Sequence, residues 1–310
     1  SANTAVTWQV NGVTGGSATT GTISTAGLYH APHSVPVSTA PNNEDQTTEV
    51  IVTAVSRANA AASDSVIVVP EPPQSARFQA PIPLGTSGGN AQDSSTSAGT
   101  TYCCGGTIGS LVARGGKLYI LSNNHVMARS DLAAVGEAIV QPGLVENNCS
   151  VNGTTTVANL SQFFNLENDP RPNVDAAIAE IVPGAVDPLG TIAQLGGTAN
   201  GDQPTDGTPN PGPGVAPAVG QKVAKSGSAT GLTCGTVLAI NASINIEYQK
   251  GCNTGTKYTV DFANQIEIAD PGFSAEGDSG SLIVTQATAD PVGLLYGGTA
   301  TDTVANPVAV

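Results

Sequence analysis

The sequence predicts an all-β protein composed of a small domain and a larger domain. Short runs rich in Val, Ile, Thr and Tyr, such as TEVIVTAVS, KLYILSN and QKVAKSG, recur between turns of Gly, Asn, Asp and Pro. Helical periodicity is nearly absent, and the best helical candidate, residues 130–139, is short and contains a glycine. Many short strands without intervening helices are typical of β-sandwiches and β-barrels.

Two stretches of turn-forming residues divide the chain. Residues 71–101 are rich in Pro at first and in Gly, Ser and Thr later, which predicts a linker that is stiff at first and then flexible. We therefore expect one β-domain over residues 1–70 and a second over residues 102–310. Residues 196–219 are rich in Gly and Pro, and they predict an exposed loop that divides the larger domain into two halves.

The chain is acidic and carries few charges. Only 11% of its residues are charged, and 10 Lys and Arg stand against 24 Asp and Glu, for a formal net charge of −14. So few cations provide no basic patch to neutralise phosphates, which argues against a nucleic acid or an anionic membrane surface as a partner. No apolar run approaches the length that crosses a membrane, so we also expect no membrane insertion.

The cysteines and histidines do not predict a metal site. No C-x-x-C pair occurs and the chain has only three histidines, so we expect neither zinc nor another cofactor. Two disulfides with one thiol left over would suit a secreted protein, whereas the alternative is five reduced, buried thiols in a cytosolic protein. The five cysteines are Cys103, Cys104, Cys149, Cys234 and Cys252.

A serine on a tight glycine turn is the first candidate catalytic residue. Ser279 lies in EGDSGSLIV, directly before an apolar run, and it is either part of an ordinary surface loop or a nucleophile. A serine nucleophile needs a base, and His125 is the only histidine after residue 70. His125 follows KLYILSNN at the end of a predicted strand, where a cleft would lie. By itself, it could equally be a histidine that packs or caps a turn.

A catalytic imidazole also needs an acceptor for its second nitrogen. Asp175 stands at the head of the apolar run AAIAEIV, and a carboxylate that enters a buried strand must be hydrogen-bonded. His125 would satisfy it, and the alternative is an aspartate that caps a turn before the strand. The chain order His125, Asp175, Ser279 is one of the known arrangements of a catalytic triad.

Five segments together resemble a bacterial trypsin-like serine endopeptidase of the chymotrypsin superfamily: GGTIGSLVA, YILSNNHVMA, NVDAAIAEI, FSAEGDSGSLIV and VGLLYGG. The resemblance covers residues 103–310 and implies two six-stranded antiparallel β-barrels with the active site between them. It implies that His125 is the general base, Asp175 the orienting acid and Ser279 the nucleophile. The backbone N–H groups of Gly277 and Ser279 would form the oxyanion hole.

The resemblance also implies a specificity pocket, formed by Phe273, Ser274, Tyr296 and Gly297. A trypsin-like pocket would have an aspartate at the position of Phe273, so we expect a preference for a small or apolar side chain. In the digestive members of the superfamily, a freed N-terminal amine pairs with the acid at the position of Asp278. No such activation sequence is evident, so we expect Asp278 to have another partner or to stay hydrated.

The cysteines fit the same picture. Cys234 and Cys252 flank a predicted hairpin and are expected to pair. Cys149 is expected to pair with Cys103 or Cys104, and the sequence does not decide between them.

The first seventy residues resemble a bacterial immunoglobulin-like domain through the stretches VTWQVNGVTGG and GTISTAGLYHAP. Trp8 would anchor its core. The Trp strand stands almost at the start of the chain, so we expect this domain to be incomplete at its N-terminus. It could contact the protease domain or a ligand on a surface.

The sequence therefore predicts a secreted or cell-surface serine endopeptidase that acts on protein or peptide substrates without a cofactor. One alternative is a surface-binding or adhesin protein whose protease-like domain is inactive. Another is a self-processing protease that cuts its own linker within residues 71–101.

Overall fold

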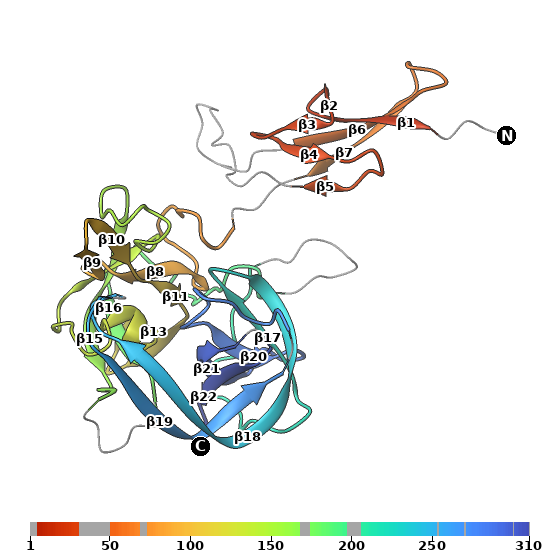
Figure 1. Ribbon diagram of the computed structural model, residues 1–310. Coiled ribbons are helices and arrows are strands. Elements are labelled where there is room, and N and C mark those ends of the chain that lie inside the picture. Colours follow the sequence, from red (N-terminus) through yellow and green to blue (C-terminus); the bar gives the residue numbers. More distant parts are fainter. Residues whose placement is uncertain are drawn as a thin grey trace. The chain divides into compact units, whose positions relative to one another are not determined.

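The computed structural model shows two compact units, Ser1–Pro73 and Gln74–Val310 (Figure 1). It describes residues 5–30, 50–68, 73–167, 174–196, 206–252, 254–269, 271–299 and 301–309. Nearly all regular structure in these residues is β-strand, and the single helix among them is α1, one turn at Asn124–Met127. The prediction of an all-β protein is confirmed.

The small unit contains two antiparallel sheets. The first has the order β2-β1-β6-β7 and consists of β1 (Val6–Val10), β2 (Val13–Thr14), β6 (Val50–Ser56) and β7 (Ser63–Val68). The second has the order β3-β4-β5 and consists of β3 (Gly16–Ser17), β4 (Gly21–Ile23) and β5 (Tyr29–His30). Trp8 is partly buried against a small core that includes Val10 and Val52. The immunoglobulin-like identity of this unit stays a prediction.

The linker predicted for residues 71–101 is wrong from residue 74 onward. Ile82 and Leu84 are completely buried in the core of the larger unit. β8 (Thr86–Asn90) is also buried and pairs with a strand on either side. The larger unit therefore begins at Gln74, and not at residue 102.

The composition of β8, TSGGN, explains why it resembles a linker. At Gly88 an added Cβ would lie 2.8 Å from the Ile108 side chain and 2.9 Å from the Val140 carbonyl oxygen. Glycine is needed because the neighbouring strands approach the backbone closely, and not because the segment is flexible.

The first half of the larger unit is an antiparallel sheet that we call the first-half sheet, with the order β11-β8-β14-β15-β16-β13-β12. Besides β8, its strands are β11 (Gly106–Ile108), β12 (Ser110–Arg114), β13 (Lys117–Ser122), β14 (Ala138–Gln141), β15 (Thr155–Phe163) and β16 (Ala177–Ile181). A separate hairpin joins β9 (Ser94–Ser97) to β10 (Thr100–Cys103). The two edge strands, β11 and β12, are separated in the chain only by Gly109, so the sheet curls back on itself.

The second half is a closed antiparallel barrel with the order β17-β18-β19-β22-β21-β20. Its strands are β17 (Lys222–Gly227), β18 (Gly231–Gln249), β19 (Lys257–Ile268), β20 (Leu282–Thr285), β21 (Pro291–Gly298) and β22 (Thr303–Pro307). The long strands β18 and β19 extend beyond the barrel as a ribbon (Figure 1). One buried core cluster contains side chains of both halves, such as Ile120 and Leu282, so the two halves pack against each other.

The predicted pairing of Cys149 with Cys103 or Cys104 is confirmed, and the other predicted disulfide is not. Cys103 pairs with Cys149, and Cys104 pairs with Cys252, so the expected Cys234–Cys252 disulfide is wrong. Cys234 is a free, exposed thiol near the start of β18, and Cys252 lies beyond the end of that strand. The unbroken length of β18 keeps these two thiols apart. Adjacent residues of an extended chain point in opposite directions, so the neighbouring Cys103 and Cys104 reach different partners.

Candidate active site

The turn that carries Ser279 is fixed by the first-half sheet. Gly277 and Gly280 flank it with φ angles of 103° and 96°, which favour glycine. The Thr107 backbone N–H donates to the Ser279 carbonyl oxygen at 2.8 Å. The Thr107 hydroxyl donates to the Gly277 carbonyl oxygen at 2.9 Å, and the Ser228 hydroxyl donates to the same oxygen at 2.6 Å. Strand β11 thus sets the position of a turn that belongs to the closed barrel.

Two glycines allow the halves to meet at this point. A Cβ at Gly109 would lie 1.8 Å from the Gly280 carbonyl oxygen, so no side chain can occupy that position. The break between β11 and β12 therefore also makes room for the Ser279 turn.

Asp278 has a partner that the sequence analysis did not identify. Its carboxylate lies 3.3 Å from the Lys225 Nζ, and both side chains are completely buried. The carboxylate also accepts the Ala229 N–H at 3.0 Å, the Thr230 hydroxyl at 2.7 Å and the Ala275 N–H at 2.9 Å. Burial lowers the pKa of Lys225, and the charge and hydrogen bond of Asp278 oppose that shift. Asp278 is therefore paired and buried, and it is not hydrated.

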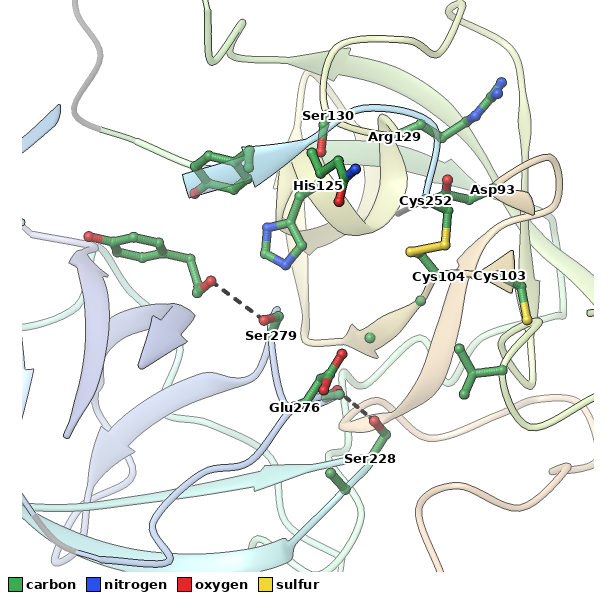
Figure 2. A pocket seen from close by; sticks show the side chains of 18 of the residues that line it. Asp93, Cys103, Cys104, His125, Arg129, Ser130, Ser228, Cys252, Glu276 and Ser279 are labelled. Atoms are coloured by element: carbon green, nitrogen blue, oxygen red, sulfur yellow. Dashed lines mark hydrogen bonds between the residues drawn. A yellow bond between two sulfur atoms is a disulfide. The ribbon is translucent and has the colours of Figure 1, made fainter. Parts of the chain in front are cut away.

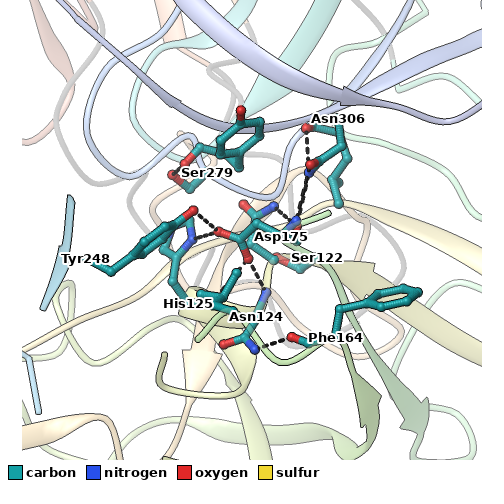
Figure 3. Close-up of polar contacts among 12 residues, drawn as sticks. Ser122, Asn124, His125, Phe164, Asp175, Tyr248, Ser279 and Asn306 are labelled. Carbon is teal, nitrogen blue, oxygen red and sulfur yellow. Dashed lines mark hydrogen bonds and ion pairs between the residues drawn. The ribbon is translucent and has the colours of Figure 1, made fainter. Parts of the chain in front are cut away.

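Strand pairing brings His125 and Asp175 together. β13 pairs with β16 with Ser122 opposite Ala177, so the residues just after β13 lie beside those just before β16. The short helix α1 places His125 at that point, and its Nδ1 lies 2.5 Å from Oδ2 of Asp175 (Figure 3). The other carboxylate oxygen, Oδ1, accepts the Asn124 N–H at 2.7 Å.

Two asparagines hold the backbone of Asp175. The Asn123 side chain donates to the Asp175 carbonyl oxygen at 2.7 Å. The Asn306 side chain donates to the same oxygen at 3.1 Å and accepts the Asp175 N–H at 3.2 Å. The sequence predicted only a turn at Asn123, and no local pattern pointed to Asn306. Asp175 itself is completely buried. Burying a carboxylate costs free energy unless it is hydrogen-bonded, and the donors around Asp175 meet that need.

Tyr248 completes the surroundings of Asp175. Its hydroxyl donates to Oδ2 of Asp175 at 2.8 Å, and its ring centroid lies 5.8 Å from that of His125. Burial, together with the negative charge of Asp175, raises the pKa of Tyr248 well above its usual value. The phenol therefore stays protonated and acts as a donor.

His125 and Ser279 face one cleft of about 760 Å³ between the two halves (Figure 2). The Ser279 hydroxyl donates to the Tyr296 carbonyl oxygen at 3.5 Å. Within the described residues, no hydrogen bond joins that hydroxyl to the imidazole, and the contacts of catalytic groups are often loose before a substrate binds. The cleft also contains Asp93, and burial raises the pKa of its carboxyl to about 6 although Arg129 opposes the shift.

The residues predicted for the specificity pocket do not share one surface of the cleft. Tyr296 lines the cleft, whereas Phe273 is buried in the core of the closed barrel. The Ser274 hydroxyl is 2.5 Å from that of Thr303. Gly297 lies in β21 and, like Ser274, is not among the residues that line the cleft. A role of these residues in substrate selection stays a prediction.

Sequence comparisons give a partial match only. The family described as the Nal1 C-terminal domain matches residues 213–305, which lie within the second half of the larger unit. No curated protein matches the sequence of this chain.

Several solved structures of serine proteases are similar to this chain. Protease A of Thermobifida fusca is 18% identical, with 73% of this chain and 91% of that chain covered and a TM-score of 0.43. A Nocardiopsis protease is also 18% identical, with 72% and 92% covered and a TM-score of 0.43. A glutamic acid specific serine protease is 21% identical, with 73% and 94% covered and the same TM-score. Scores of this size do not by themselves assign a function.

Proposed function

We propose that the larger unit is a serine endopeptidase with the triad His125, Asp175 and Ser279. The observation that carries the proposal is the 2.5 Å contact between His125 and the buried Asp175, at a cleft that also exposes Ser279. An imidazole that is oriented by a carboxylate beside a serine on a glycine turn is the arrangement that nucleophilic acyl transfer requires.

The chemistry uses two steps. The Ser279 Oγ attacks the scissile carbonyl carbon and gives its proton to Nε2 of His125. The tetrahedral intermediate collapses, the C–N bond breaks, and the leaving amine takes that proton from the imidazole. Water then attacks the acyl ester with His125 as the base, the acid product leaves, and Ser279 recovers its proton.

The turn at Gly277 supports an oxyanion hole. Among the hydrogen bonds of the described residues, none uses the backbone N–H of Gly277 or of Ser279 as its donor. Two unused donors beside the nucleophile suit the negative oxygen of a tetrahedral intermediate. The buried Lys225–Asp278 pair supports this turn, so Asp278 does not need an N-terminal amine as its partner in the proposed activity.

The two disulfides support an extracellular location, because such bonds persist in oxidising compartments. No helix in the described part of the chain is long and apolar enough to cross a membrane. The small unit would then be an immunoglobulin-like domain that binds a surface ligand.

The fold argues against self-processing within residues 82–90. Ile82, Leu84 and β8 are buried, so a cleft could reach them only after the larger unit opens. A protein or peptide from outside is the substrate that the exposed cleft supports.

The test uses a fluorophosphonate probe and a peptide-cleavage assay. We expect the probe to label Ser279 in the wild-type protein, and we expect Ser279→Ala and His125→Ala to lose both labelling and cleavage. Ser97→Ala, at an exposed position in β9, is the matched control and should behave like the wild type. Equal cleavage by wild type and Ser279→Ala would contradict the mechanism. A wild-type protein that is neither labelled nor active would favour the adhesin alternative.

A further inference from the structure

The β18–β19 ribbon is fastened to the first half of the larger unit at its tip. Cys252, in the tip, forms a disulfide with Cys104, which follows β10. The Ser95 hydroxyl donates to the Gly251 carbonyl oxygen at 2.6 Å. Lys250 also forms an ion pair with Glu167. A segment of the closed barrel is thus held against the first half at three places.

Tyr248 lies at the end of β18, four residues before the disulfide-bonded Cys252. It is 6% exposed, and its ring stacks on that of Tyr258 in the paired strand, with centroids 5.8 Å apart. Its hydroxyl points at Asp175, as Figure 3 shows. The ribbon therefore carries one polar atom from the second half to the proposed triad acid.

The two oxygens of the Asp175 carboxylate have different hydrogen-bond partners. Oδ1 accepts the backbone N–H groups of Asn124 at 2.7 Å and of His125 at 3.3 Å. Oδ2 faces Nδ1 of His125 at 2.5 Å and the Tyr248 hydroxyl at 2.8 Å. Of these side-chain donors, only Tyr248 comes from the other half of the unit.

Packing alone does not explain the hydroxyl of Tyr248. The aromatic contacts with His125 and Phe262 need only the ring, which phenylalanine would also supply. A buried hydroxyl costs free energy unless it is hydrogen-bonded, and in the described residues its one bond is to Asp175. The oxygen therefore fits a role at the carboxylate.

We propose that Tyr248 is a positioning residue for the triad, and that the Cys104–Cys252 disulfide holds it in place. The inference rests on the proposed function. The hydroxyl fixes the rotation of the Asp175 carboxylate, so that Oδ2 stays in line with Nδ1 of His125. The proton then remains on Nδ1, and Nε2 is left free to accept the proton of Ser279.

The first experiment compares Tyr248→Phe with Tyr258→Phe, a matched control that removes one hydroxyl from the neighbouring tyrosine of the ribbon. Two quantities are measured: kcat and KM with one peptide substrate, and the downfield proton NMR resonance of the His125–Asp175 hydrogen bond. For Tyr248→Phe we expect kcat to fall roughly tenfold with KM within about twofold. We expect the resonance to move upfield, because Oδ2 is no longer held in line with Nδ1 of His125 and the hydrogen bond between them becomes weaker. Tyr258→Phe should change neither quantity.

The second experiment removes the disulfide by Cys104→Ala together with Cys252→Ala. When no other residue is changed, we expect the loss of the disulfide to lower kcat as much as Tyr248→Phe does. We expect it to move the resonance of the His125–Asp175 hydrogen bond in the same direction. In the Tyr248→Phe background we expect little further effect, because the two changes remove one interaction. Additive effects in the double background would overturn the role given to the disulfide.

The outcomes separate this inference from the proposed function. If Tyr248→Phe matches Tyr258→Phe in kcat and in the resonance, Tyr248 does not position the triad. If the wild-type protein cleaves no peptide, the proposed function fails. The resonance then still decides whether Tyr248 orients the His125–Asp175 pair.

Discussion

The Nζ of Lys225 lies 3.3 Å from the carboxylate of Asp278, and neither side chain is exposed to solvent. Asp278 stands between Gly277 and Ser279, so this buried pair fixes the backbone of the turn that carries the proposed nucleophile. Lys225 also donates to the Gly231 carbonyl oxygen at 3.0 Å, so the ammonium group is hydrogen-bonded as well as paired. A loss of the pair would affect both the stability of the larger unit and the shape of the proposed oxyanion hole.

Lys225→Met should strongly destabilise the larger unit, because it leaves the buried carboxylate of Asp278 without its counter-charge. Breaking such a pair costs about 3–5 kcal/mol, and we expect a loss of this size in urea denaturation together with slower fluorophosphonate labelling. Adding Asp278→Asn should recover part of the stability, since it removes the unpaired charge. Lys117→Met, which breaks the solvent-exposed pair with Glu180, should cost far less stability, because water screens that pair. Equal losses for the two lysines would contradict the argument.

Asp93→Asn should stabilise the larger unit at neutral pH but not in acid. Burial raises the pKa of the Asp93 carboxyl from 3.8 to about 6, Arg129 and His125 lower it in part, and Glu137 adds to the rise. The folded state therefore favours the protonated acid. The wild-type free energy of unfolding loses this contribution as the pH rises from about 4 through about 6. We expect Asn to gain up to about 3 kcal/mol above pH 6 and nothing below pH 4. A gain that is constant from pH 4 to pH 8 would exclude this cause.

Two fragments test where the larger unit begins. A fragment over residues 74–310 retains Ile82, Leu84 and β8, and we expect it to fold with the cooperative unfolding of a single unit. A fragment over residues 102–310 lacks these buried groups and leaves β11 and β14 without their shared neighbour. We expect it to be unfolded by circular dichroism and by amide hydrogen exchange. Equal folding of both fragments would restore the linker interpretation.

Thiol chemistry can check the disulfide pairing directly. Without denaturant, iodoacetamide should modify Cys234 alone, because it is the exposed free thiol. Proteolytic mapping of the unreduced protein should find peptides that link Cys103 to Cys149 and Cys104 to Cys252. A peptide that links Cys234 to Cys252 would show that the ribbon is paired differently.

Candidate residues that are recognised by their neighbours in the chain could be predicted from the sequence. Ser279 stands on a glycine turn, His125 follows a strand, and Asp175 enters one, and each of these signals spans fewer than about ten residues. The two β-runs next to His125 and Asp175 pair, and that pairing brings the two side chains into contact. Their catalytic roles stay proposals until Ser279 is labelled.

Residues that act across the two halves were not predicted. Tyr248 and Asp175 are 73 residues apart, and Asn306 and Asp175 are 131 apart, so no local pattern connects them. A buried position of Lys225 could have been predicted from the sequence. Lys225 lies two residues after Val223, which is buried, and a strand places both side chains on one face. A lysine on a buried face requires an anion, and Asp278 is that anion.

The all-β class, the division into a small and a larger unit, and the three candidate triad residues could be predicted from the amino-acid sequence alone. Runs of apolar residues, turn-forming residues and the one histidine after residue 70 are properties of the sequence itself, so they can be recognised without knowledge of the fold. The folded structure was needed to show that β8 is a buried strand, which cysteines pair, and what surrounds Asp175 and Asp278. Those features depend on which strands become neighbours in space. At Gly88 and Gly109 a neighbouring backbone lies too close for a side chain, but the sequence shows only a glycine, which occurs in flexible loops as well.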